Sequence, residues 1–197
     1  EHPSWQDVLR YYMIKIMPEQ RDSEFTWKGF QEANNNELVG NFSNFVNRVM
    51  VLIEKNFHNQ NLIYDRKALF ISPSSSAENI SAEEVLGAMH IYAVSILEEI
   101  NRFNFRQALQ TLMDLSTYGN QFLQNNAPWA LAKTDPDQAS RVLNMGLQIV
   151  KLLGVLCAPF MPFTSEKIKL FLKNDQDIAW NTLKEKLKTG HSIIPEN

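Results

Sequence analysis

The chain has 197 residues, 44% of them hydrophobic, with only 7 glycines and 8 prolines. This composition supports a sizeable buried core and excludes a disordered or fibrous chain. The formal net charge of -3 gives no indication of a nucleic-acid partner. A mildly acidic protein can nevertheless carry local positive surface, so the charge alone does not exclude such a partner.

No apolar run reaches the roughly 18 residues that a membrane span requires, and residues 1–5 lack the features of a signal peptide. We therefore expect no membrane partner. The single cysteine, Cys157, excludes a disulfide framework and a cysteine-based zinc site within this chain. We expect Cys157 to be buried and unreactive. A protein without disulfides fits the cytoplasm.

Helical periodicity dominates the chain, and no segment shows the sustained alternation of a strand. The sequence therefore predicts an all-α bundle of about five main helices. The bundle is preceded by a short helix around Trp5–Met17. The main helices are predicted over 36–58, from Ser81 to Ile100, from Asn104 to before Pro128, over Val142–Leu156 and over Thr164–Lys173.

Capping residues mark several of these boundaries. Ser81 and Glu84 form a capping-box pattern, Asn104 is a plausible cap, and Asp137 is the expected N-cap of the fourth helix. A linker is expected over residues 59–77, and a weaker amphipathic stretch, Leu183–Leu187, closes the chain. Both ends break off inside incomplete elements, so we expect a piece of a longer protein.

Signatures of catalysis are absent from the sequence. It contains no phosphate-binding glycine-rich loop, no His-Glu-x-x-His and no nucleophile elbow. The four histidines lie far apart in sequence, and adjacent carboxylates such as Glu83 and Glu84 cannot share a helix face. We predict neither catalytic residues nor a metal site.

Three segments carry a resemblance to a known family. The first is Leu9-Arg10-Tyr11-Tyr12 with Asp22-x-x-Phe25-x-Trp27-x-x-Phe30. The second runs from Asn36 to Arg48, and the third joins Asn120-Gln121-Phe122-Leu123 to Ala127-Pro128-Trp129-Ala130-Leu131-Ala132-Lys133. In this order and spacing the chain resembles the methionyl-tRNA synthetase family over essentially its whole length.

The resemblance implies a domain organisation and a function. Residues 1–35 would be a stem-contact segment and residues 36–197 a helical anticodon-binding domain of the class I type. The expected partner is methionine tRNA with its CAU anticodon; DNA is not expected as a partner. The catalytic domain, with the ATP and magnesium it needs and a zinc site in some members, would lie outside this chain, which needs no cofactor of its own.

Candidate binding residues lie on two helices. On a helical wheel Asn44, Arg48 and Lys55 line one edge of the helix over 36–58, away from its apolar face. Taken alone this is an ordinary solvated edge. The resemblance implies that Asn44 and Arg48 read the first anticodon base and that Trp129, held by Pro128, stacks on it.

Further cations are candidates for phosphate contacts, with weaker support: Lys55, Arg106 and Lys133. Trp27 is expected to be a packing residue. Two alternatives stay open. One is a helical protein–protein interaction module in which Pro128 and Trp129 anchor a peptide. The other is the anticodon bundle of another class I synthetase (cysteinyl, isoleucyl or valyl).

Overall fold

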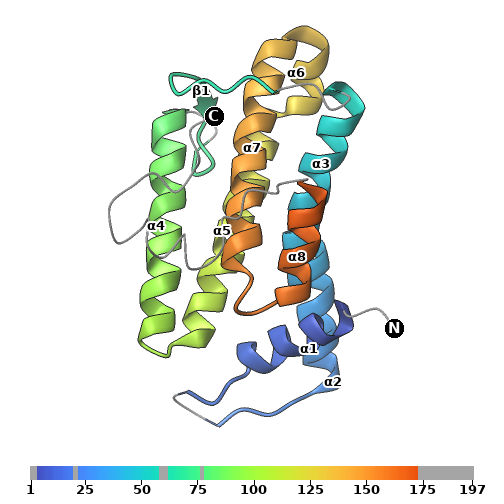
Figure 1. Cartoon of the computed structure of the whole chain (residues 1–197), viewed down its shortest axis with the longest axis vertical. Helices are drawn as coiled ribbons and strands as arrows, with labels where there is room; N and C mark the ends of the chain where they lie inside the picture. The colour runs from blue at the N-terminus through green and yellow to red at the C-terminus, as the bar shows by residue number, and fades with distance from the viewer. Residues whose placement is uncertain (1–3, 20–21, 58–61, 76–77, 173–197) are drawn as a thin grey trace.

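The computed structural model describes residues 4–19, 22–57, 62–75 and 78–172. Long helices stand side by side in a bundle, with α1 and α2 across one end and α6 at the other (Figure 1). In chain order the elements are α1 Ser4–Lys15, α2 Trp27–Glu32, η1 Ala33–Ser43, α3 Asn44–Phe57, β1 Leu69–Ile71, β2 Asn79–Ser81, α4 Ala82–Asn101, α5 Phe105–Asn126, α6 Pro128–Thr134, α7 Pro136–Leu156 and α8 Pro162–Phe171. The predicted all-α bundle is confirmed.

The core is built around α7, which contacts α3, α4, α5, α6 and α8. By length and composition alone this helix is apolar enough to cross a membrane, with a mean hydropathy of 1.3, a feature that the sequence analysis overlooked. Its apolar window is 83% buried inside the bundle. The neighbouring helices therefore account for its hydrophobic surface. Cys157, directly after α7, is buried as expected, and burial raises the pKa of its thiol.

A continuous helical path, formed by α2, η1 and α3, runs from Trp27 to Phe57. The predicted start at Asn36 is wrong, because the Thr26 hydroxyl already caps the helix by accepting from the Gly29 amide at 3.1 Å. The middle eleven residues follow the wider π pattern, which is rare and mostly short in proteins. The boundary placed between residues 35 and 36 falls inside this path, and the two-segment division stays a prediction.

Helix starts follow the capping rules, with one correction. The capping box of Ser81 and Glu84 is present, and its hydrogen bonds lower the pKa of the Glu84 carboxyl. Asn104 is the N-cap residue of α5, as predicted. Asp137 is not the cap of α7: Asp135 is, accepting from the Gln138 amide at 3.0 Å. Pro136 occupies the first helical position, which proline favours, so the cap is the residue before it.

The ends of other elements also differ from expectation. Pro128 opens a separate short helix, α6, which the sequence analysis did not predict. Likewise α8 begins at Pro162, two residues before the expected start at Thr164, and ends at Phe171. The stretch Leu183–Leu187 lies outside the described residues.

A small antiparallel pair, β1 and β2, covers the end of α5. Phe70 of β1 is buried with its ring 5.2 Å from that of Phe122. The Asn126 side chain forms hydrogen bonds with both backbone groups of Ile71 in β1. It accepts from the Ile71 amide at 2.8 Å and donates to the Ile71 carbonyl at 2.9 Å. This polar clamp fixes the last turn of α5, which leads directly into Pro128 and Trp129.

Aromatic side chains near the opposite end of the bundle are more exposed than expected. Trp27 is 77% exposed, so its assignment as a packing residue is wrong. Its indole forms T-shaped pairs with the rings of its neighbours Phe25 and Phe30. Trp5 on α1 is 59% exposed as well.

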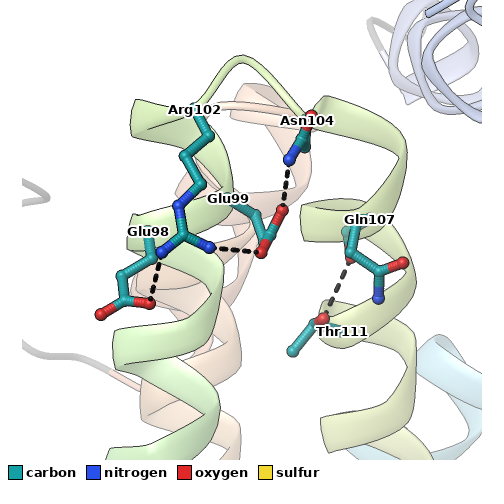
Figure 2. Close-up of polar contacts among 6 residues, drawn as sticks. All are labelled: Glu98, Glu99, Arg102, Asn104, Gln107 and Thr111. Atoms are coloured by element: carbon teal, nitrogen blue, oxygen red, sulfur yellow. Dashed lines mark hydrogen bonds and ion pairs between the residues drawn. The ribbon is translucent and has the colours of Figure 1, made fainter. Parts of the chain in front are cut away.

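The corner between α4 and α5 is held by a charged cluster (Figure 2). The Arg102 guanidinium lies 3.6 Å from Glu98 and 3.4 Å from Glu99. The Asn104 amide group donates to the same Glu99 carboxylate at 2.8 Å, which explains why this residue caps α5 without a side-chain bond to its own helix. Glu99 thus joins both helices.

The backbone of this corner forms a Schellman motif. The Phe103 amide donates to the Ile100 carbonyl at 3.0 Å, and the Asn104 amide donates to the Glu99 carbonyl at 2.9 Å. The motif requires a left-handed residue at its turn, where glycine is usual. Phe103 adopts this conformation with φ 61°, although its side chain is 75% exposed and gains little from burial.

Phe103→Gly should therefore raise the free energy of unfolding by about 1 kcal/mol, because it removes the Cβ that penalises left-handed backbone. Urea denaturation followed by circular dichroism measures this change. Phe103→Ala is the matched control, since it removes the same ring but keeps the Cβ. Equal stability of the two variants would contradict the strain at this position.

Candidate nucleic-acid interface

A sharp turn after α5 presents Trp129. Ala127 lies in the left-handed region, with φ 39°, and Pro128 starts α6 directly after it. Pro128 is buried, whereas Trp129 keeps 37% of its surface exposed. The proline thus anchors the turn and leaves part of the indole facing solvent.

Arg48 of α3 meets this indole across the bundle. Its guanidinium carbon lies 5.2 Å from the centroid of the Trp129 ring, within the range of a cation–π interaction. One guanidinium nitrogen also lies 3.5 Å from the Gln124 side-chain oxygen of α5. Three helices therefore converge on one half-exposed cation, and the expected meeting of Arg48 and Trp129 is observed.

Asn44 lies one turn before Arg48 and faces the same seam between α3 and α5. Its side-chain nitrogen donates to the Asn120 oxygen at 3.1 Å. Asn120 in turn donates to the Asn41 carbonyl and the Asn41 side-chain oxygen, both at 3.0 Å. The exposed amide of Asn44 is thus the outer end of a chain of amides that crosses the seam.

The helices approach closely because of a glycine. A Cβ on Gly119 of α5 would lie only 2.6–2.8 Å from ring atoms of Phe45 on α3. The ring of Phe45 is fully buried, so it occupies the space that a side chain at residue 119 would need. This contact brings α3 near enough for short amide side chains to reach α5.

The three candidate phosphate-binding cations are not together. Lys55 lies two turns after Arg48 on α3, Lys133 lies one turn after Trp129 on α6, and both are exposed. Arg106 lies at the other end of α5. The helix rise of 1.5 Å per residue puts it about 27 Å from Gln124, which contacts Arg48. There it lines a cavity of about 660 Å³ with several carboxylates: Glu19, Glu37 and Glu99. The structure thus brings Lys55 and Lys133 to the end of the bundle that holds Arg48 and Trp129, but not Arg106.

Three residues that support this site had no role predicted from the sequence: Asn41, Asn120 and Gln124. A signal for two of them was present, since Asn120 and Gln124 are four residues apart and lie on one face of α5, with Ser116 one turn earlier. Periodicity shows that such residues share a face. It does not show which helix that face meets.

The arrangement can recognise a flat, polar group. The exposed indole offers a stacking surface, Arg48 offers fixed donors, and Asn44 offers an amide beside them. Among the described residues there is no group of three or more His, Cys, Asp or Glu side chains that could hold a metal ion. The site is suited to binding an unstacked base.

Comparison with known families agrees with this geometry. Residues 73–197 match the family described as "Anticodon binding domain of methionyl tRNA ligase". The chain belongs to this family. Residues 2–50 also match the family "tRNA synthetases class I (M)", a range that includes Asn44 and Arg48. The two matches together include all the candidate residues except Lys55.

Similar proteins include the methionine–tRNA ligases of Flavobacterium psychrophilum, 38% identical over 98% of this chain, and Porphyromonas gingivalis, 37% identical over 98%. The chain spans 27% of the length of each of these two relatives. Methionyl-tRNA synthetase from Mycobacterium tuberculosis in complex with methionyl-adenylate has the same fold, with a TM-score of 0.66 at 19% identity over 82% of this chain and 30% of its own.

The close approach at Gly119 can be tested by substitution. Gly119→Ala should lower the free energy of unfolding by about 1–3 kcal/mol, because the added methyl overlaps the buried ring of Phe45. Thermal and urea unfolding measure this loss.

Gly87→Ala in α4 is the matched control, since nothing lies within 4 Å of an added Cβ there. Alanine favours a helix interior over glycine, so this variant should gain up to about 1 kcal/mol. If Gly119→Ala were as stable as Gly87→Ala, the seam would not depend on the missing side chain.

Proposed function

We propose that this chain binds the anticodon loop of methionine tRNA and reads the first base of its CAU anticodon with Asn44, Arg48 and Trp129. The observation that carries this proposal is the position of the Arg48 guanidinium, 5.2 Å from the centre of the half-exposed Trp129 ring. Family membership supports the same reading.

The chemistry of the pocket suits a cytosine. RNA is recognised by sequence mainly in single-stranded loops, where unstacked bases lie on aromatic rings and bond through their Watson–Crick edges. Cytosine offers two acceptors and one amino donor on that edge. Arg48 supplies donors to the acceptors, and the Asn44 oxygen accepts from the amino group.

The expected energies are large enough to determine which tRNA binds. Stacking of a base on an aromatic side chain contributes about 1–3 kcal/mol, and a good pair of hydrogen bonds discriminates between bases by about 1–3 kcal/mol. Their sum of roughly 2–6 kcal/mol corresponds to a factor of about 30 to 20,000 in affinity.

Phosphate contacts add a term that does not depend on sequence. Lys55 and Lys133 are exposed at the pocket's end of the bundle, and we assign them contacts with the phosphates near the base. Arg106 shares its cavity with three carboxylates, which repel phosphate, so we assign it no contact with the loop.

The activity of the whole protein is also a proposal. The relatives that the chain matches over 98% of its length are methionine–tRNA ligases, which suggests ATP-dependent methionylation of tRNA in the cytoplasm. That chemistry, with its ATP and magnesium and any zinc, belongs to parts other than these 197 residues. The chain by itself should bind RNA and catalyse nothing.

Titration with two RNA stem-loops tests the proposal. The loops carry CAU or UAU and are compared at two salt concentrations, because phosphate contacts weaken with salt and base contacts do so much less. We expect the CAU loop to bind at least tenfold more tightly at both concentrations. A protein-interaction scaffold would bind both loops equally or not at all.

Trp129→Ala should weaken binding of the CAU loop by about 1–3 kcal/mol, because the stacking surface is lost. The CAU-over-UAU preference should fall with it, and circular dichroism should show an intact bundle. Fluorescence anisotropy measures the affinity.

Trp27→Ala is the matched control. This tryptophan is even more exposed, at 77%. It begins α2, which lies at the opposite end of the bundle from α6 (Figure 1), so its removal should leave loop binding unchanged. If the two substitutions changed loop binding equally, Trp129 would have no specific role in binding.

A further inference from the structure

The hydrogen bonds across the seam have a fixed direction. The Asn120 side-chain nitrogen lies 3.0 Å from the Asn41 carbonyl and 3.3 Å from the Ser116 carbonyl. Both partners are backbone carbonyls, which can only accept. The amide of Asn120 must therefore turn its nitrogen toward them, and its oxygen necessarily points the other way.

A second amide is oriented by the same rule. The Asn41 nitrogen donates to the Met113 carbonyl at 3.2 Å and to the Thr117 hydroxyl oxygen at 2.9 Å. The Asn41 side-chain oxygen consequently faces Asn120 and accepts from it at 3.0 Å. The Ser116 hydroxyl donates to the same oxygen at 3.1 Å. The side-chain amides of Asn41 and Asn120 are thus oriented consistently, and each donates to a backbone carbonyl.

The direction passes outward to Asn44. The Asn120 oxygen accepts from the Asn44 nitrogen at 3.1 Å, so Asn44 directs its nitrogen into the seam. Its own side-chain oxygen is left on the solvent side, and none of the described residues donates a hydrogen bond to it. The exposed atom at this point of the pocket is an acceptor.

We propose that Asn120 is a positioning residue that sets base specificity: it locks the Asn44 amide with its oxygen outward, so that the pocket prefers a pyrimidine carrying an amino group over one carrying a carbonyl at the same position. This inference rests on the proposed function. Asn120 itself does not touch the base.

The locked polarity explains discrimination between cytosine and uracil. The cytosine amino group donates to the outward Asn44 oxygen, whereas the corresponding uracil oxygen would face that oxygen with no hydrogen between them. A free asparagine amide could rotate by 180° and offer its nitrogen to uracil. The amide chain prevents this rotation, because a rotated Asn44 would turn its oxygen toward the Asn120 oxygen.

Asn120→Ala tests the lock with the same CAU and UAU stem-loops. The freed Asn44 amide can then donate to uracil, so the CAU-over-UAU affinity ratio should fall on the order of tenfold, about the value of one hydrogen bond. The ratio should fall mainly because the variant gains affinity for the UAU loop, not because it loses affinity for the CAU loop. A purely structural role would weaken both loops by the same factor and leave the ratio unchanged, which would overturn the inference.

A second substitution should restore the preference. In Asn44→Asp combined with Asn120→Ala, the carboxylate can only accept, so the ratio should return toward its original value without the amide chain, even though the added charge weakens both loops. Asn44→Asp alone places two oxygens face to face against Asn120 and should bind the CAU loop less well than the double variant. Failure of the double variant to recover the ratio would also overturn the inference.

Gln121→Ala is the matched control, because Gln121 is the exposed neighbour of Asn120 on α5 and should leave the ratio unchanged. The unmodified chain separates the two levels of proposal. If it does not distinguish CAU from UAU, the proposed function fails. If it does, and Asn120→Ala retains the full ratio, only the role of Asn120 fails.

Discussion

The closeness of α3 and α5 is the constraint on which the rest of the site depends. The absent side chain at Gly119 lets the buried ring of Phe45 lie against the α5 backbone. At that separation asparagine side chains, with only one methylene each, can span from helix to helix. A wider seam would need water or longer side chains, which hold an amide less firmly. The geometry of the exposed Asn44 is therefore decided by a contact inside the core.

The position of Trp129 depends on a second set of contacts at the end of α5. Asn126 ties the last turn to β1, and the left-handed Ala127 with the buried Pro128 then reverses the chain. Arg48 reaches the resulting indole from α3, and one of its guanidinium nitrogens lies 3.5 Å from the Gln124 side-chain oxygen. The pocket thus rests on helices, which suits its proposed role of telling one base from another by the direction of its hydrogen bonds.

Periodicity was sufficient to predict the bundle and most helix ends, because apolar stripes and capping residues are local signals. Periodicity did not predict the helix start at Trp27, because this helix begins with polar and exposed aromatic residues and has no buried apolar stripe there. The edge carrying Asn44 and Arg48 was predictable from the wheel. Its partner was not, since Arg48 and Trp129 are distant in sequence and only the resemblance linked them. The supporting amides of α5 went unnoticed because a helix wheel does not show which faces meet.

The two ends of the bundle differ in the charges that they carry. Lys55 and Lys133 lie at the same end of the bundle as Arg48, whereas the cavity around Arg106 at the other end holds three carboxylates and Lys15. A nucleic-acid surface that depends on phosphates usually carries a broad basic face, whereas the phosphate contacts proposed at this end of the bundle are only two, Lys55 and Lys133. If the chain binds the anticodon loop as proposed, two such contacts neutralise few phosphates, and the sequence-independent part of the affinity is small. Discrimination in the proposed site then depends on the base contacts, where a fixed acceptor beside a fixed guanidinium gains the most from rigidity.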